Sequence, residues 1–471
     1  MENFYTKFVG FMNTWLYQPY VVPLFLILAG LIFTIGTKFV QFRCLGETFR
    51  VVGEKPKEKG GISSFGALMV STASRVGTGN IIGVSTALCT GGPGAIFWLW
   101  VTALLGGASA FVESTLAQIF KRRDTDGSSY GGPSYYMETA LGQRWLGVVF
   151  AVIIILTYAV GYNMLASFNL QSCFAGFGFY VEKKTPLIIG IILAILFAII
   201  VLGGAKRLTK TTEVLVPVMG VFFIIVSLVA MVLNAGKLGE MFGMIFRDAF
   251  NFKAIFGGFF GSCIMWGIKR GLYSNEAGMG SAPNAAATAD VSHPAKQGLV
   301  QMLSVFLDSI IICTATAFMC LSSGVVPTLD ASGAPYVQAS MEATFGSFGP
   351  IFIAIALSLF AFTTLIGNYY YCEGCLRFIL KRKPSKALLT VFRICATALV
   401  LVGALLSAGI VWDTADMLQG LMVIINIPVI IILAKPAFAC LEDYVAQRKA
   451  GKEPVYNAKK CGVDKPTEYW N

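Results

Sequence analysis

Long stretches without charge alternate with short polar segments along almost the whole chain. Six stretches contain no Asp, Glu, Lys or Arg: residues 8–37, 145–181, 185–205, 214–236, 343–372 and 394–412. A helix needs about 20 mostly apolar residues to cross the hydrocarbon core of a bilayer. With the less regular apolar stretches added, the pattern predicts eleven membrane-spanning helices, at residues 18–37, 64–88, 95–118, 146–171, 186–204, 213–235, 252–280, 298–322, 349–372, 388–409 and 416–436.

The predicted spans are helices and not the strands of a barrel. The run "AVIIILTYAV" at residues 151–160 lacks the alternation of apolar and polar positions that strands of an outer-membrane barrel require. Composition agrees, since 56% of the 471 residues are hydrophobic and 13% are charged, against about 25% charged in soluble domains. A soluble protein of this length could not bury so much apolar surface. We therefore expect an all-α polytopic membrane protein.

The net charge of +11 is concentrated on alternate loops. Lys and Arg gather in residues 38–59, 121–144, 206–210 and 377–386 and in the tail from 435. Basic residues mark the cytoplasmic loops of membrane proteins. The pattern therefore predicts an inner or plasma-membrane protein with its N-terminus outside and its C-terminus in the cytoplasm. It argues against a nucleic-acid partner, because the charge follows one side of the bilayer.

Two predicted spans are interrupted by glycine and polar residues, the second at "RVGTGN" (75–80) and the seventh at "MWGIKRGLYSNEAGMG" (265–280). Paired interrupted helices at corresponding positions are typical of transporters built from inverted repeats. Unwound backbone is tolerated at this depth only where it is buried in protein or lines a cavity. Close helix packing through glycine is the alternative, but it explains neither the pairing nor the polar residues.

This symmetry divides the chain into a first helix with its loop, two repeats of five helices, and a tail. Each repeat begins with an interrupted helix, and the two repeats must insert in opposite orientations because each has an odd number of spans. The expected boundaries are 1–62, 63–236, 237–440 and 441–471.

The first break provides groups that suit a small zwitterion. A new helix N-terminus near Thr78, Gly79 and Asn80 has free amides and the positive end of the helix dipole, which suit a carboxylate. The carbonyls freed between Ala73 and Val76 suit sodium or an ammonium group. We expect the amides of Thr78 and Gly79 to bind the substrate carboxylate, and Asn80 to orient the substrate or a cation. An ordinary polar kink is the alternative.

The chain resembles the alanine or glycine:cation symporter family over residues 18–440, in "SRVGTGNIIGVSTALCTGGPGAIFWLW", "GGPSYYMETALG", "RGLYSNEAGMGSAPNAAATA", "HPAKQGLV" and "FAFTTLIGNYYYCEGC". The resemblance implies an eleven-helix protein with a ten-helix inverted-repeat core of the leucine-transporter type. It implies import of alanine or glycine together with sodium. The chain departs from the family pattern at Asn368, where Trp is usual, and this affects the wall of the pocket.

The substrate-facing part of the second break is expected at "CIMWGIKRG". Counting about 1.5 Å per residue from the surface near residue 252 places the bilayer midplane near 262–267. Asn275 is included in the substrate set and, with Glu276, is expected to support the inner half-helix. Four further residues are expected to contact the substrate: Met265, Trp266, Gly267 and Ile268.

A sodium site is expected where the ninth span meets the first break. The motif "FAFTT" ends in two adjacent hydroxyls, and oxygen ligands suit a hard cation. Adjacent threonines in a membrane helix are often satisfied by their own backbone, but the resemblance favours the sodium role. The predicted ligands are Ala73, Val76, Phe360, Thr363 and Thr364.

Charged residues at this depth should be paired or face water. We expect Arg270 to pair with Glu276, and Arg75 and Lys269 to have acidic neighbours. Glu113, Glu276 and Asp308 are the available acids. An acid within the membrane could instead relay protons, so a proton-coupled transporter of the same fold is the alternative.

Other classes of membrane protein fit the chain less well. A channel needs a continuous polar pore with repeated ligands, whereas this chain has one asymmetric central site. An enzyme needs a catalytic constellation, and neither a Ser/His/Asp set nor paired metal ligands are present. His293, the sole histidine, is expected to cap a helix or lie in a loop. We therefore expect a secondary active transporter, a monomer without cofactor, that carries a small neutral amino acid with sodium.

Overall fold

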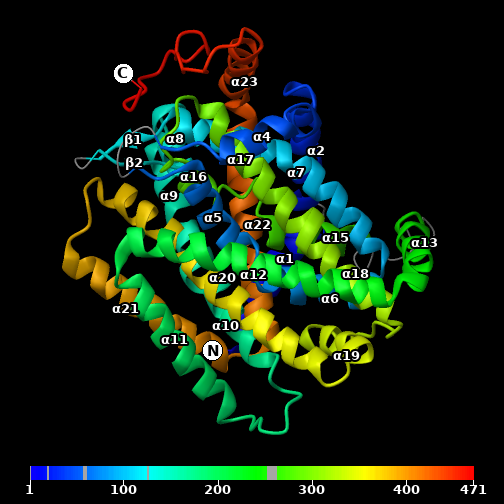
Figure 1. The fold of residues 1–471 in the computed structure, drawn as a ribbon. Coiled ribbons are helices and arrows are strands. Elements are labelled where there is room, and N and C mark those ends of the chain that lie inside the picture. Colours follow the sequence, from blue (N-terminus) through cyan, green and yellow to red (C-terminus); the bar gives the residue numbers. More distant parts are fainter. Residues whose placement is uncertain (1, 19–20, 57–60, 125–126, 252–262, 471) are drawn as a thin grey trace.

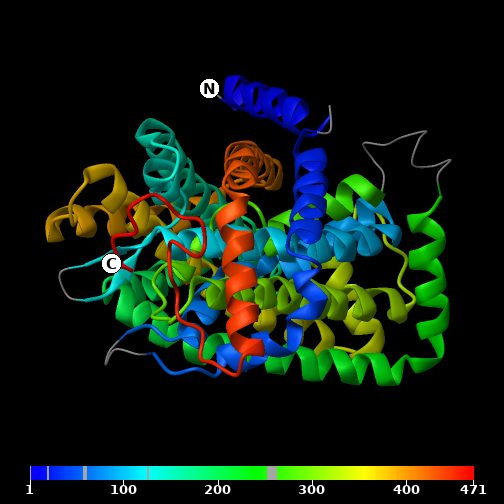
Figure 2. The same cartoon turned by 90° about the horizontal axis from the view of Figure 1, so that it is seen from above.

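The computed structural model describes residues 2–18, 21–56, 61–124, 127–251 and 263–470. The chain is a bundle of helices (Figure 1). Within the described residues, strands are confined to one short antiparallel hairpin, β1 (Arg122–Arg123) with β2 (Ser129–Tyr130). Figure 2 shows the C-terminal tail turning back over the bundle after α23 (Ala434–Lys449).

Each predicted span corresponds to one helix or to consecutive helical segments. By length and composition, eight helices of the described chain could cross a membrane, and α11 is a shorter apolar helix. The two interrupted spans complete an arrangement consistent with eleven crossings. Residues 252–262, the predicted start of the seventh span, lie outside the described residues. In chain order the spans are α2 (Val21–Gly36); α5 (Ser64–Arg75), the π-helical turn η1 (Gly79–Gly83) and α6 (Val84–Gly91); α7 (Gly94–Ile119); α9 (Arg144–Ile155), η2 (Leu156–Tyr162) and α10 (Asn163–Ser172); α11 (Thr185–Val201); α12 (Gly204–Leu233); α15 (Cys263–Asn275) and α16 (Pro283–Ala286); α17 (Pro294–Val305), η5 (Phe306–Cys313) and α18 (Thr314–Ser323); α20 (Phe348–Leu380); α21 (Lys386–Leu405); and α22 (Ala408–Ile432).

Several helices lie outside the predicted spans. The first of them, α1 (Glu2–Tyr17), packs on α22, where Tyr17 Oη donates to the carbonyl of Asp416 at 2.9 Å. The apolar pattern did not predict this helix, because it is too short to span a membrane. The others are α3 (Val40–Arg43), α4 (Leu45–Val52), α8 (Pro133–Thr139), η3 (Ala235–Lys237), α13 (Leu238–Ala249) and α19 (Ala334–Phe345).

The periphery of the bundle is apolar, as a lipid-facing surface must be. Large aliphatic side chains on three outer helices are exposed, with Ile188 of α11 at 56%, Val218 of α12 at 60% and Ile394 of α21 at 60%. In water such a surface would favour association, whereas in a bilayer it contacts acyl chains. Composition and fold therefore agree that this is a polytopic helical membrane protein.

Glycine allows the helices at the centre to approach closely. A Cβ on Gly267 of α15 would lie 2.5 Å from the carbonyl oxygen of Ala95 in α7, and a Cβ on Gly367 of α20 would overlap the amide of Ser74 in α5. Without a hydrophobic force between helices in lipid, small residues at such contacts increase van der Waals packing. The contacts hold α15 and α20 against the helices that surround the two breaks.

We predict that Gly349→Ala destabilises the protein, because the added methyl would overlap the backbone of Met341 in α19. Overpacking of this kind costs about 1–3 kcal/mol. Gly374 in the same helix faces open space, so Gly374→Ala is the matched control and should leave the midpoint of unfolding unchanged or slightly raised. Thermal unfolding in one detergent compares the two variants, and equal midpoints would contradict the close contact.

Candidate functional site

The first break lies where the sequence predicted it. Helix α5 ends at Arg75, Val76 leaves the helical region with ψ 87°, and η1 begins at Gly79. The amide of Gly77 donates to Oδ1 of Asn80 at 2.8 Å, so it does not continue the helix to the carbonyl of Ala73. Within the described chain, the amides of Thr78 and Gly79 have no hydrogen-bond acceptor. The break therefore presents free amide donors and free carbonyl acceptors of the backbone, in a fully buried position.

The second break lies further along the chain than predicted. Helix α15 continues unbroken through Asn275, and the unwound segment is residues 276–282. There Gly278 and Gly280 have φ values of +83° and +81°, which favour glycine. The interruption predicted at 265–280 includes most of this segment, but the placement of its substrate-facing part at "CIMWGIKRG" was wrong, because those residues are helical and Gly267 packs against α7. This removes the reason for assigning four residues of α15 to the substrate: Met265, Trp266, Gly267 and Ile268.

A buried carboxylate, that of Asp308 in η5, joins the two interrupted helices. Its Oδ1 accepts from Nδ2 of Asn80 at 2.6 Å, and its Oδ2 accepts from the hydroxyl of Ser274 at 2.8 Å. Both polar ends of the Asn80 side chain are thus engaged within the protein. Asn80 therefore shapes the first break, and Asp308 fixes that break to the end of α15.

Two further buried acids satisfy the second break. Glu276 accepts from the hydroxyls of Ser74 and Ser281, each at 2.7 Å. Glu113 of α7 accepts from the amide of Gly280 at 3.1 Å. Since unsatisfied backbone groups are costly in an apolar interior, these carboxylates stabilise the unwound segments.

Asn368 also takes part in this network. Its Oδ1 lies 2.7 Å from the hydroxyl oxygen of Ser74, whose single hydrogen it shares with Glu276, and its Nδ2 donates to Oδ1 of Asn163 at 3.0 Å. The departure from the family pattern therefore puts an amide beside the first break. Asn275, by contrast, accepts from the amide of Ala277 at 3.0 Å and so supports the second break.

Arg75 lies among these acids without an ion-pair contact to any of them in the described chain. The side chain is 1% exposed, and one terminal nitrogen donates to the carbonyl of Gln301 at 3.1 Å. Nε and Nη2 have no partner among the described residues. Its positive charge acts through space on Glu113, Glu276 and Asp308. The guanidinium thus offsets part of the negative charge that holds the breaks.

The pairing expected for Arg270 was wrong. Arg270 forms two bonds with the carboxylate of Asp416 in α22, at 3.0 and 3.2 Å, and Lys269 contacts the same carboxylate at 2.6 Å. Asp416 lies 146 positions away in the chain, so local spacing could not indicate this partner. The local candidate, Glu276, is instead engaged by the serines of the two breaks.

Aromatic rings cover the first break next to this ion pair. A Cβ on Gly79 would lie 2.8 Å from the ring of Tyr273, which makes edge contacts with Tyr162 and Trp412 at centroid distances of 5.0 and 5.1 Å. The guanidinium of Arg270 lies 4.2 Å from the centre of the Trp412 ring. Sequence reasoning missed Tyr273 because it placed the second break about three turns too early.

Of the two threonines proposed for sodium, the structure brings one to the break. Oγ1 of Thr364 lies so close to Gly77 that a Cβ there would overlap it, and it has no partner among the described residues. The hydroxyl of Thr363 donates to the carbonyls of Leu359 and Phe360 in its own helix, at 3.0 and 3.1 Å. The backbone thus satisfies Thr363, whereas Thr364 has a free hydroxyl beside the break.

A cavity of about 980 Å³ opens at one end of the bundle, which we call the basic end. Its lining includes Pro56, Asp124, Lys206 and Lys383, so the loops rich in Lys and Arg meet there. Asn284, just after the second break, also lines it. The Arg270–Asp416 pair lies before that break, on the side away from the basic end. The described part of the chain is therefore hollowed on the side of the breaks where the basic loops lie.

Comparison with known proteins agrees with this architecture. A family model described as the sodium:alanine symporter family matches residues 1–458. The chain belongs to this family. It is accordingly a sodium-coupled amino-acid transporter of the membrane and not an enzyme.

Relatives of the symporter cover nearly its whole length. The amino-acid carrier protein AlsT of Bacillus subtilis is 45% identical over 472 residues, which is 100% of this chain and 98% of the relative. The probable sodium/glutamine symporter GlnT of the same organism is 44% identical, with 97% and 94% covered. The sodium/alanine symporter AgcS of Methanococcus maripaludis is 38% identical, with 91% and 95% covered.

A solved structure supports the fold of the symporter. The crystal structure of MhsT in complex with L-phenylalanine superposes with a TM-score of 0.56, covering 89% of this chain and 96% of that chain. The identity is 15%, so the likeness concerns the fold alone. It agrees with the expected inverted-repeat core of the leucine-transporter type.

We predict that Asp416→Ala strongly destabilises the symporter, because the buried Arg270 and the partly buried Lys269 would lose their counter-charge. Breaking a buried pair from one side costs about 3–5 kcal/mol. Glu442→Ala is the control. It removes an ion pair with Lys38 in which the side chain of Glu442 is 61% exposed and that of Lys38 is 65% exposed, so it should cost at most about 1 kcal/mol. Denaturation in detergent provides the measurement, and a similar loss in both variants would contradict a structural role for the buried pair.

Proposed function

We propose that the protein imports a small neutral amino acid, alanine or glycine, by symport with sodium. The observation that carries the proposal is the first break, where free amides and freed carbonyls lie together in a buried position. The amides of Thr78 and Gly79 would bind the substrate carboxylate, since they lie at the positive end of a helix dipole. The carbonyl of Val76 would face the ammonium group or the ion.

The surroundings of the break favour a small side chain. The ring of Tyr273 lies against Gly79, and Oγ1 of Thr78 accepts from Nδ2 of Asn169 at 2.9 Å. These contacts leave little room beside the backbone that would hold the carboxylate. Tyr273 and Asn169 therefore join the proposed substrate site, in place of the four residues of α15.

For sodium we propose the carbonyls of Ala73 and Val76 together with Oγ1 of Thr364. The carbonyl of Phe360 completes the set, while Thr363 is dropped because its hydroxyl bonds its own helix. Carbonyl and hydroxyl oxygens suit a hard monovalent cation. The ion would join α5 to α20 and so favour one arrangement of the two repeats.

Alternating access would follow from this arrangement. By the positive-inside rule the basic end is cytoplasmic, so the cavity opens inward and the Arg270–Asp416 pair closes the outer side. Opening outward would break that pair and close the cavity. One charge moving across 100 mV provides about 2.3 kcal/mol, which drives accumulation.

Coupling to protons is the second candidate. Two relatives are named sodium/proton-dependent alanine carriers, at 39% and 38% identity. The acids Glu113, Glu276 and Asp308 are fully buried, as a proton relay would require. Their hydrogen bonds to the breaks instead favour a structural role, so we place sodium first.

We predict that proteoliposomes accumulate labelled alanine above equilibrium when an inward sodium gradient is imposed, but not with an equal potassium gradient. Unlabelled glycine should compete, whereas glutamine, the substrate named for one relative, should compete weakly. Liposomes without protein are the control. Accumulation driven equally well by a proton gradient without sodium would contradict sodium coupling.

We predict that Thr364→Val raises the sodium concentration for half-maximal uptake roughly 10- to 100-fold. This is the loss of affinity expected when one ligand bond to a charged group is removed. Thr363→Val is the matched control on the same helix and should stay within about threefold, because its hydroxyl bonds backbone carbonyls. Sodium titration of uptake at fixed alanine measures both. Equal shifts in both variants would place the ion elsewhere.

A further inference from the structure

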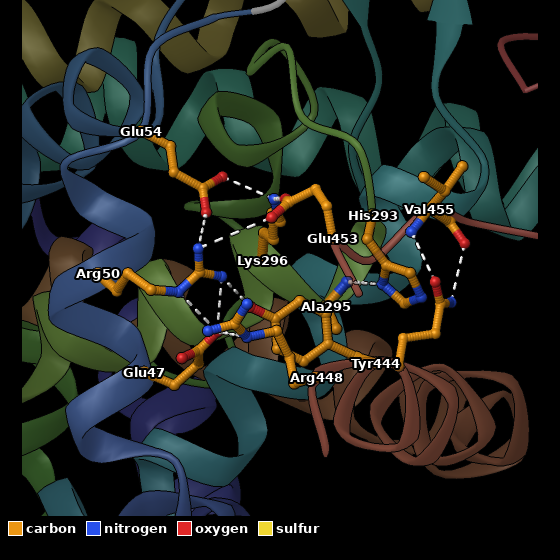
Figure 3. Close-up of polar contacts among 11 residues, drawn as sticks. Glu47, Arg50, Glu54, His293, Ala295, Lys296, Tyr444, Arg448, Glu453 and Val455 are labelled. Carbon is orange, nitrogen blue, oxygen red and sulfur yellow. Dashed lines mark hydrogen bonds and ion pairs between the residues drawn. The ribbon is translucent and has the colours of Figure 1, made fainter. Parts of the chain in front are cut away.

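The chain after α23 folds back onto the basic end. The amide of Tyr456 donates to the carbonyl of Ser292 at 3.0 Å, and Nε1 of Trp470 donates to the carbonyl of Gln118 at 2.8 Å. Figure 3 shows Glu453 reaching Lys296 and the neighbouring Arg50. The last residues thus form an ordered layer over α17 and α7.

Beneath this layer lies a cluster of side chains that commonly bind metals. Ligand atoms of His293, Asp443 and Cys461 all lie within 4.8 Å of one another. The thiol of Cys440 lies beside that of Cys461, close enough for the two groups to interact. His293, Cys440 and Cys461 are each 0% exposed. Three separate segments, the start of α17, helix α23 and the tail, therefore contribute to one buried group.

The chemistry of this group suits zinc. Two thiols, one imidazole and one carboxylate make four ligands of the types that zinc takes in tetrahedral sites. Cys440 and Asp443 are three positions apart on α23, so they lie on the same face of the helix. Bond lengths of about 2.0–2.3 Å place tetrahedral ligand atoms roughly 3.3–3.8 Å apart. The ligand atoms of His293, Asp443 and Cys461, which lie within 4.8 Å of one another, would have to move about 1 Å closer at their longest separation.

The neighbours of the cluster hold the imidazole in place. Edge contacts with the rings of Tyr444 and Tyr456, at centroid distances of 5.4 and 5.8 Å, fix its plane. Nδ1 accepts from the amide of Ala295 at 3.2 Å as the cap of α17, so Nε2 faces Asp443 at 3.3 Å. A metal on Nε2 would move the ring proton to Nδ1 and displace this cap bond, and four ligands together outweigh that loss.

We propose that His293, Cys440, Asp443 and Cys461 form a zinc site that fixes the C-terminal tail to the start of α17. The sequence predicted a cap or loop role for His293, and the cap is confirmed. A metal on Nε2 would replace this cap bond. Tyr469, further along the tail, lines the large cavity, so the site would order the chain beside the inner opening.

The first experiment measures zinc in the purified full-length symporter. Protein prepared in detergent under reducing conditions is incubated with zinc chloride, desalted and analysed by elemental mass spectrometry. We expect one zinc per chain. Cys461→Ser and His293→Asn should each weaken binding at least about 10-fold, and Asn retains the ability to cap α17.

The matched control is Cys395→Ser, which removes an exposed cysteine on α21 and should retain one zinc. Cobalt added to the wild type should give the thiolate-to-metal absorption of a tetrahedral site, and Cys461→Ser should lose it. The cobalt spectrum tests the site without a variant of the buried Cys440, which could fail to fold. The proposal would be overturned if the wild type bound neither zinc nor cobalt, or if the Cys461→Ser variant bound both as well as the wild type. A disulfide between Cys440 and Cys461 in place of the metal would also overturn it.

Discussion

Every part of the site depends on one constraint: a backbone that leaves the helical conformation inside a membrane must have its polar groups satisfied within the protein. The chain unwinds twice at the centre of the bundle. The carboxylates of Glu113 in α7, Asp308 in η5 and Glu276 in the second unwound segment accept from residues at these two breaks. Without these acceptors, the unwound segments would return to helix or the bundle would loosen.

The same arrangement explains why the site can hold a ligand at all. The acids satisfy side chains and glycine amides, yet the amides of Thr78 and Gly79 and the hydroxyl of Thr364 remain without partners in the described chain. Buried polar groups without partners are costly unless something binds them. The protein therefore stabilises the breaks themselves and leaves a few groups free, which we propose bind substrate and ion.

Charge is balanced at the centre in a similar way. Arg75 carries a positive charge into a region with three carboxylates, and it is anchored through the carbonyl of Gln301 and not through an ion pair. A direct pair would draw one acid away from the break that it holds. On the side of the breaks away from the basic end, Arg270 and Lys269 share Asp416, so one carboxylate offsets the charge of two cations.

The sequence by itself determined the class of protein, the spans and the first break, because lipid imposes length and apolarity on each helix and "RVGTGN" cannot form a continuous one. It did not determine the second break, since Gly267 and Gly278 look alike in a sequence although one packs on α7 and the other has a positive φ. The partner of Arg270 and the clustering of His293 with Cys461 were decided only by the tertiary structure. Each joins residues more than a hundred positions apart, and local patterns carry no information about which helices become neighbours.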